Sequence, residues 1–189
     1  MNLPNKLTIL RVCMIPVYVA AFYITEIPFN FIVAAVIFAL AAFTDFLDGY
    51  IARKNNIVTD FGKFLDPIAD KVLVSTALII FLAPPTGIEI LPNYAAIFVA
   101  AIIARELIIS GFRLVAAGKN IVIAADKSGK IKTFFTDITI IFILICAQVD
   151  VYAMHVAGIV LLGVSALLTV ISGAECIIKN ISALKQDKK

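Results

Sequence analysis

Long apolar runs separated by short polar stretches dominate the chain. A helix that crosses a bilayer needs about 20 mainly apolar residues, and the runs approach that length. They predict six membrane-spanning helices, at Leu7–Thr25, Phe31–Ile51, Phe61–Ala83, Tyr94–Ala116, Ile131–Gln148 and Val151–Ile178. Proline, glycine and asparagine gather between the runs, as expected for turns. The pattern predicts an all-α integral membrane protein, in which residues 1–189 form one domain with six transmembrane helices.

The composition supports this prediction and excludes several other classes. Apolar residues make up 62% of the chain and the mean hydropathy is +1.04, whereas soluble domains are about 45–50% apolar. The net charge of +3 comes without a basic tract interleaved with aromatics, so nucleic-acid binding is not expected. The three cysteines lack metal-ligand spacing and are interpreted as packing residues. The first apolar run lacks a cleavage pattern and is expected to be retained as a span.

Lysine and arginine alternate along the chain in a way that predicts its orientation. They occur at both termini and in the connections after the second and fourth runs. The other three connections carry only acidic charges, at Glu26, Glu89 and Asp150. Because positive charge concentrates on the cytoplasmic side of membrane proteins, both termini are expected in the cytoplasm. The predicted location is the cell membrane, with multiple spans.

Four aspartates form the most unusual polar feature, because ionisable groups at membrane depth are costly and usually functional. Asp45 and Asp48 are three apart near the end of the second predicted helix, and Asp66 and Asp70 are four apart near the start of the third. Both spacings place the two side chains of a pair on one helix face. The short loop Lys54–Thr59 makes the two helices antiparallel neighbours, so the pairs are expected to face each other on the cytoplasmic side.

These carboxylates predict a divalent metal site. Four close carboxylates repel one another, and only Arg53 and Lys63 lie nearby to compensate. Oxygen ligands without histidine or cysteine suit Mg²⁺ or Mn²⁺, and two such ions about 4 Å apart can clamp a phosphoryl group. The alternative is that the aspartates only form ion pairs between helices. Four of them at matched helical spacings favour the metal site.

The residues between the aspartates suit a phosphorylated ligand. Gly49, Ala52 and Gly62 are small, which lets a diphosphate or nucleotide approach the backbone closely. Arg53 offers a planar fork for phosphate, and Lys63 adds a second positive charge. Asp70, which lies deeper along the third helix than Asp66, is the candidate general base.

Eight of these positions meet the pattern D-x2-D-G-x2-A-R-x8-G-x3-D-x3-D without a departure. The stretch therefore resembles the CDP-alcohol phosphatidyltransferase family, whose members are six-helical, membrane-embedded and usually homodimeric. The resemblance implies that Asp45, Asp48 and Asp66 bind metal, and that Asp70 binds metal and deprotonates the acceptor hydroxyl. It also implies that Gly49 and Arg53 contact the CDP part of a CDP-diacylglycerol donor.

Four further segments, NLPNKLTILR, FGKFLDPIADK, ARELIISGFR and SGKIKT, are similar to one subgroup of that family, the bacterial phosphatidylglycerophosphate synthases. This resemblance implies sn-glycerol 3-phosphate as the acceptor, with phosphatidylglycerophosphate and CMP as products. It also suggests that Asn5, Thr8 and Arg11, at the entry to the first predicted helix, line the nucleotide or acceptor site. The alternative for Asn5 is a cap of the first helix.

A second basic set supports a phosphorylated acceptor independently. Its members are Arg105, Arg113, Lys130 and Lys132. The two arginines are eight apart, which places them on one helix face, and the lysines begin the fifth predicted helix, where backbone N–H groups also favour anions. The set is interpreted as a pocket for the acceptor phosphate. In the alternative interpretation, Arg105 only pairs with Glu106 or reaches the interface, and the lysines only set the orientation.

Three rival functions stay open. The same family includes members with other acceptors: inositol phosphate, serine or phosphatidylglycerol. Intramembrane prenyl transfer also uses aspartate pairs and magnesium-bound diphosphate, although Gly49, Arg53 and the second basic set argue against it. A divalent-cation transporter would place carboxylates near the bilayer midplane within two matching halves. The sequence contains no internal repeat.

Overall fold

The structure is a computed structural model that describes residues 3–55, 60–85, 89–118, 121 and 127–185. Within these ranges, the side chains of residues 3–4, 46, 48–50, 52–55, 60–64, 66–67, 127–128, 130 and 182–185 are not described. The described chain contains six α-helices and no strand. The prediction of an all-α fold is confirmed for this part of the chain.

The helices follow the predicted apolar runs closely. Their bounds are α1 Leu3–Tyr23, α2 Asn30–Asn55, α3 Asp60–Ile80, α4 Ala95–Gly118, α5 Lys127–Val149 and α6 Tyr152–Lys185. The largest difference is at α6, which continues past the predicted end at Ile178. Lysine, alanine and leucine follow there, and these residues favour the helix without needing an apolar face.

Four helices are long and apolar enough to cross a membrane. The qualifying segments within the described residues are Asn5–Tyr23, Ala95–Gly118, Ile131–Val149 and Tyr152–Ile181. α2 contains a shorter apolar stretch, Asn30–Asp45, which ends where the aspartates begin. α3 carries the second aspartate pair in its first half. The two helices that hold the carboxylates are therefore the two whose apolar stretches are interrupted.

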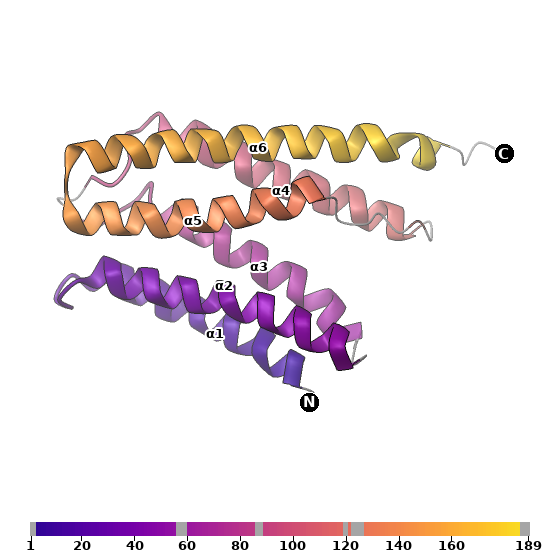
Figure 1. Cartoon of the computed structure of the whole chain (residues 1–189), viewed down its shortest axis with the longest axis horizontal. Coiled ribbons are helices and arrows are strands. Elements are labelled where there is room, and N and C mark those ends of the chain that lie inside the picture. Colours follow the sequence, from indigo (N-terminus) through magenta and orange to yellow (C-terminus); the bar gives the residue numbers. More distant parts are fainter. Residues whose placement is uncertain (1–2, 56–59, 86–88, 119–120, 122–126, 186–189) are drawn as a thin grey trace. The chain divides into compact units, whose positions relative to one another are not determined.

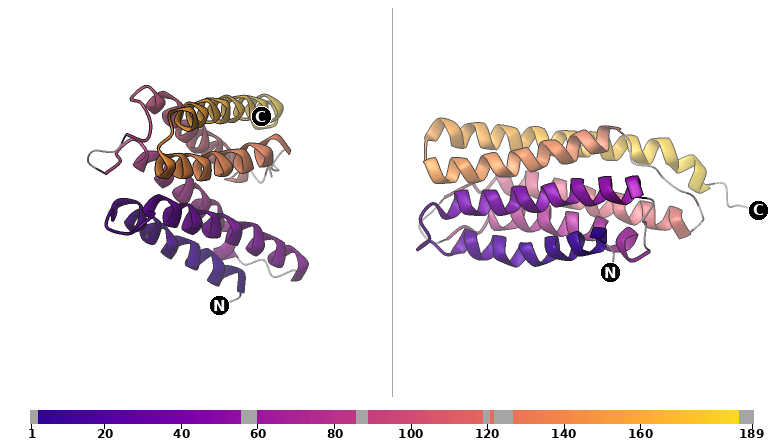
Figure 2. Two further views of the ribbon diagram at one scale, coloured as in Figure 1. Left: turned by 60° about the vertical axis from the view of Figure 1, so that its left-hand side comes forward. Right: turned by 60° about the horizontal axis from the view of Figure 1, so that its bottom comes forward.

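By its contacts the chain divides into two compact units. The first comprises residues 1–92 and 140–158, and the second comprises residues 93–139 and 159–189. In the first unit, α1 packs against α2 and α3, and α1 and α2 run side by side in both figures (Figures 1 and 2). Phe22 lies at the centre of an aromatic cluster, with ring centroids 5.4 Å from Phe31 and 6.1 Å from Phe81. This cluster fixes the ends of the helices that lie away from the aspartates.

Two hydrogen bonds tie the first unit together near the same cluster. The hydroxyl of Tyr23 donates to the carbonyl of Ala83 at 2.6 Å. The side-chain amide of Asn30 donates to the carbonyl of Phe22 at 3.0 Å. The bond from Asn30 closes the turn between α1 and α2, whereas the bond from Tyr23 joins the end of α1 to the residues that follow α3. Together they hold the ends of the three helices against one another.

α5 and α6 form an antiparallel hairpin (Figure 1). Asp150 lies in its turn with a positive φ of 53°, a conformation that aspartate tolerates better than most residues. In the second unit, the hydroxyls of Thr136 and Ser165 meet at 2.7 Å and join the two helices. Gly163 of α6 lies beneath the ring of Phe98 of α4. α4 is thereby packed on the hairpin within that unit.

Candidate functional site

The polar residues of α1 are buried within the first unit. Thr8 is 1% exposed, Asn5 is 9% exposed and Arg11 is fully buried. A buried arginine is costly unless its charge and its donors are satisfied. The predicted donor-site residues Asn5 and Thr8 therefore share one end of α1 with a buried cation.

Arg11 reaches across to α2 and holds the first predicted metal ligand. Its Nη1 lies 2.7 Å from Oδ1 of Asp45, and its Nε donates to the carbonyl of Ala41 at 3.3 Å. The hydroxyl of Thr44 donates to the same carbonyl at 2.6 Å. The arginine side chain is fully buried, whereas the Asp45 side chain keeps 42% of its surface exposed. Asp45 is thus oriented by Arg11, while a large part of its side chain stays exposed.

The other predicted residues of the aspartate stretch are placed only in part. Asp70 lies on α3 and is half-buried. The side chains of the remaining residues lie outside the described ones: Asp48, Gly49, Ala52 and Arg53 on α2, and Gly62, Lys63 and Asp66 on α3. α2 and α3 pack against each other, which agrees with the predicted antiparallel pair. Among the described residues, no group of three acidic, histidine or cysteine side chains is close enough to hold a metal ion.

The second unit holds a separate polar cluster, whose centre is Glu106 of α4. Glu106 accepts a hydrogen bond from Nη1 of Arg105 at 3.2 Å and forms a short ion pair with Nζ of Lys132. The side chains of these three residues are between 8% and 15% exposed. Two largely covered cations therefore share one largely covered carboxylate.

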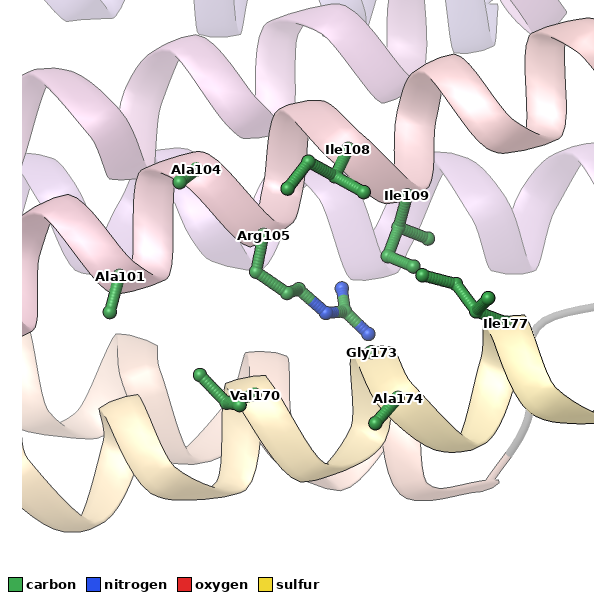
Figure 3. A pocket seen from close by; sticks show the side chains of 9 residues that line it. All are labelled: Ala101, Ala104, Arg105, Ile108, Ile109, Val170, Gly173, Ala174 and Ile177. Carbon is green, nitrogen blue, oxygen red and sulfur yellow. The ribbon is translucent and has the colours of Figure 1, made fainter.

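Arg105 is also bound to α6. Its Nη2 donates to Oγ of Ser172 at 2.7 Å, while its Nε is buried without a hydrogen-bond partner among the described residues. Figure 3 shows the side chain crossing from α4 toward Gly173 and Ala174. Arg113, further along α4, is half-buried, and its Nε likewise lacks a partner within the described part of the chain.

The structure therefore brings Arg105 and Lys132 of the predicted phosphate pocket together through Glu106. The pairing of Arg105 with Glu106 was the alternative interpretation of the sequence, and the pair is present. The side chain of Lys130 lies outside the described ones. Sequence reasoning missed Ser172 and Gly173 as partners of Arg105. The spacing of Ser165, Thr169 and Ser172, which lie on one face of α6 and are buried, is the signal that could have marked this face.

Comparison with known proteins agrees with the motif. The family model for CDP-alcohol phosphatidyltransferase matches residues 1–171. A CDP-diacylglycerol–glycerol-3-phosphate 3-phosphatidyltransferase of Bacillus subtilis (strain 168) is 40% identical, over 97% of this chain and 97% of that protein. Proteins of the same name are 40% identical in Rickettsia bellii, over 91% of each chain, and 39% identical in Salmonella typhimurium, over 89% of this chain and 88% of that protein. The predicted resemblance is confirmed, and the chain belongs to the CDP-alcohol phosphatidyltransferase family.

Proposed function

We propose that this protein transfers the phosphatidyl group of CDP-diacylglycerol to sn-glycerol 3-phosphate, which gives phosphatidylglycerophosphate and CMP. The observation that carries the proposal is the similarity, at 40% identity over 97% of both chains, to a relative whose name states this activity. The complete D-x2-D-G-x2-A-R-x8-G-x3-D-x3-D pattern supports the same reaction. The enzyme acts within phospholipid biosynthesis as a membrane phosphatidyltransferase.

The described carboxylates fit a hard divalent cation. Asp45 has one oxygen against Arg11 and 42% of its side chain exposed, which leaves it able to bind an ion. Carboxylate oxygens are the ligands that Mg²⁺ and Mn²⁺ prefer. We assign Asp45, Asp48, Asp66 and Asp70 as the ligands of two such ions, which when bound would neutralise the diphosphate of the donor.

Proton transfer and donor binding are assigned to side chains of the protein. Asp70 accepts the proton of the glycerol hydroxyl while that oxygen attacks the β-phosphorus, and the bond from this phosphorus to the CMP oxygen breaks. Donor contacts are assigned to eight residues: Asn5, Thr8, Asp48, Gly49, Ala52, Arg53, Gly62 and Lys63. No side chain acts as a nucleophile, so no covalent lipid–enzyme intermediate is expected.

The acceptor phosphate is assigned to Arg105, Arg113, Lys130 and Lys132. Support comes from the contacts of Glu106, which Arg105 and Lys132 share, so that these three described residues together carry one net positive charge. The buried Nε atoms of Arg105 and Arg113 have no hydrogen-bond partner in the described part of the chain. A doubly charged phosphate supplies both the charge and the acceptors that this cluster lacks.

The placement in the membrane extends the same proposal. All six helices are assigned as spans of one domain in the cell membrane, with both termini and the aspartates on the cytoplasmic side, because only the connections expected there carry lysine or arginine. A homodimer is expected from the family resemblance.

An acceptor panel tests the proposal. The purified protein in detergent is incubated with CDP-diacylglycerol, Mg²⁺ or Mn²⁺ and one acceptor at a time: sn-glycerol 3-phosphate, inositol phosphate, serine or phosphatidylglycerol. We expect CMP release with sn-glycerol 3-phosphate alone, its loss after chelation, and its return with either metal. Release with another acceptor and none with sn-glycerol 3-phosphate would reject the acceptor. Consumption of a labelled prenyl diphosphate instead would reject the family's reaction.

A further inference from the structure

Gly173 of α6 lies directly beneath the side chain of Arg105. A Cβ atom built at this glycine would stand 2.8 Å from Cγ and 2.9 Å from Nε of Arg105. Figure 3 shows the arginine leaving α4 and passing over Gly173. Carbon–carbon contacts of folded proteins lie at about 3.5–4.0 Å, so a methyl group at this position and the present arginine conformation exclude each other.

The clash cannot be relieved at the free end of the arginine. Cγ and Nε lie in the middle of the side chain, so a methyl group on Gly173 would displace the whole guanidinium. That guanidinium is held by Ser172 on one side and by Glu106 on the other, at 2.7 Å and 3.2 Å. Consecutive residues of α6 therefore do two things for one arginine: Gly173 gives it passage and Ser172 anchors its tip.

The space beside Arg105 offers a displaced guanidinium no substitute partners. A pocket of about 300 Å³ adjoins it, lined mainly by apolar residues of α4 and α6, among them Ala101, Ile108, Val170 and Ile177. A charged group moved into apolar surroundings loses its hydrogen bonds without replacement. The conformation seen here is thus strongly preferred while residue 173 is glycine.

We propose that Ser172 and Gly173 are positioning residues that set Arg105 for a phosphate monoester and so favour a phosphorylated acceptor. The inference rests on the proposed function, because it takes Arg105 as a ligand of the acceptor phosphate. The two residues touch neither substrate and act only through the arginine. Their replacement should therefore change the handling of the acceptor and not that of the lipid donor.

Gly173→Ala tests the passage, and Gly163→Ala is its matched control. Gly163 lies in the same helix, but a Cβ there would meet only the ring of Phe98, at 3.6 Å, an ordinary contact. Both changes alter helix propensity equally. We expect Gly173→Ala to raise the KM for sn-glycerol 3-phosphate about tenfold or more, with the KM for CDP-diacylglycerol and the kcat at saturating acceptor within twofold. Gly163→Ala should leave all three within twofold.

Ser172→Ala tests the anchor without adding an atom, and it decides the inference if Gly173→Ala fails to give folded protein. It should raise the same KM by about tenfold, because it removes a hydrogen bond to a charged group. Equal changes in both KM values, or no change for either variant, would overturn the inference. A rise for Gly163→Ala as large as that for Gly173→Ala would do the same.

Arg105→Ala separates this inference from the function on which it rests. In the double variant of Arg105→Ala and Gly173→Ala, the KM for sn-glycerol 3-phosphate should equal that of Arg105→Ala alone, because residues that act through one group are not additive. If Arg105→Ala raises this KM while Gly173→Ala and Ser172→Ala do not, the inference fails and the proposed acceptor site stands. If Arg105→Ala leaves it unchanged, the acceptor site and the inference both fail.

Discussion

Each unit pairs an arginine with a carboxylate, but the two pairs differ in which group stays exposed. In the first, Arg11 is fully buried and Asp45 keeps 42% of its side chain exposed. In the second, Arg105 and Lys132 enclose Glu106, whose side chain is 15% exposed. The carboxylate is open in one unit, and in the other it is enclosed by cations.

The difference assigns different ligands to the two clusters. An exposed carboxylate held by one oxygen can bind a cation, and an arginine behind it fixes its direction. An enclosed carboxylate with two cations around it has little capacity left, and the surplus positive charge of that cluster suits an anion. We therefore propose that the same type of ion pair prepares one cluster for metal and the other for phosphate.

The largest effect expected from this contrast follows from Asp70→Asn in the first unit. The change keeps the shape of the side chain and removes its capacity to take a proton. Proton transfer by a positioned base contributes about 10²–10⁴-fold, so we expect kcat to fall by at least about 100-fold while the protein stays folded. CMP release under saturating substrates measures kcat. Near-normal turnover would remove Asp70 from its assigned role.

Thermal unfolding supplies the control for that variant. The chain contains no tryptophan, but Cys146 and Cys176 are buried and free, so a thiol-reactive dye can follow unfolding in detergent. Cys13 is exposed and reacts at the start. Asp70→Asn should keep the midpoint of the unmodified protein within a few degrees.

A smaller effect, on stability instead of chemistry, is expected from Glu106→Gln in the second unit. The change leaves Arg105 and Lys132 buried without their shared counter-charge. Breaking a buried ion pair from one side costs about 3–5 kcal/mol, and we expect about 3 kcal/mol because the carboxylate keeps some exposure. Glu26→Gln, at an exposed position, should have no measurable effect on the unfolding midpoint.

The same variant also tests whether the cluster of Arg105, Glu106 and Lys132 binds phosphate. If that cluster binds phosphate, sn-glycerol 3-phosphate should raise the midpoint of Glu106→Gln more than that of the unmodified protein, because ligand binding to the folded state stabilises it and the variant has more uncompensated positive charge. Equal unfolding midpoints for Glu106→Gln and Glu26→Gln would mean that Glu106 does not stabilise the fold as the counter-ion of Arg105 and Lys132. A midpoint that sn-glycerol 3-phosphate leaves unchanged would contradict the phosphate site.

Replacing each arginine by lysine should affect the two ligands separately. Lysine keeps the charge but loses the fork that contacts two groups at once. We expect Arg11→Lys to raise the Mg²⁺ concentration for half-maximal activity by about 10–100-fold, and to leave the KM for sn-glycerol 3-phosphate within twofold. Arg105→Lys should raise the KM for sn-glycerol 3-phosphate and leave the Mg²⁺ concentration for half-maximal activity within twofold. Activity is measured for both variants while the concentration of Mg²⁺ or of sn-glycerol 3-phosphate is varied. If both variants change the same one of these two quantities, the distinction between the two units is wrong.

The sequence predicted the helices well because each coincides with a long apolar run that is bounded by polar and turn-forming residues. Every described helix begins and ends within a few residues of its apolar run, apart from the extended end of α6. The motif in α2 and α3 was equally readable, since its residues lie on adjacent helices joined by a short loop. These features depend on residues that lie close together in the sequence, so the sequence alone can predict them.

Contacts between distant helices were not predictable in the same way. In α6, Ser165, Thr169 and Ser172 lie four and three apart on one helix face and are buried. This stripe marks a packing face, but it does not identify Arg105, 67 positions before Ser172, as the partner. Arg11 stood out as a charge in an apolar run, but its pairing with Asp45 depends on how α1 and α2 rotate against each other. Glu106 was foreseen as a partner of Arg105 because the two are neighbours in sequence. Its simultaneous pairing with Lys132 of α5 was not foreseen.

The smallest effect is expected from Thr136→Val. This variant tests whether the hydroxyl contact between α5 and α6 near Lys132 contributes to stability alone. The hydroxyl of Thr136 donates to the carbonyl of Lys132 at 2.9 Å and meets the hydroxyl of Ser165 at 2.7 Å. Hydroxyl contacts between membrane helices contribute about 0.6 kcal/mol on average, so the unfolding midpoint should fall slightly. Thr133→Val is the matched control, since Thr133 bonds only within its own helix among the described contacts. Both variants should keep the KM for sn-glycerol 3-phosphate within twofold. A tenfold rise in this KM for Thr136→Val would mean that the contact between α5 and α6 positions Lys132. Thr136, one turn further along α5, would then contribute to binding of the acceptor phosphate.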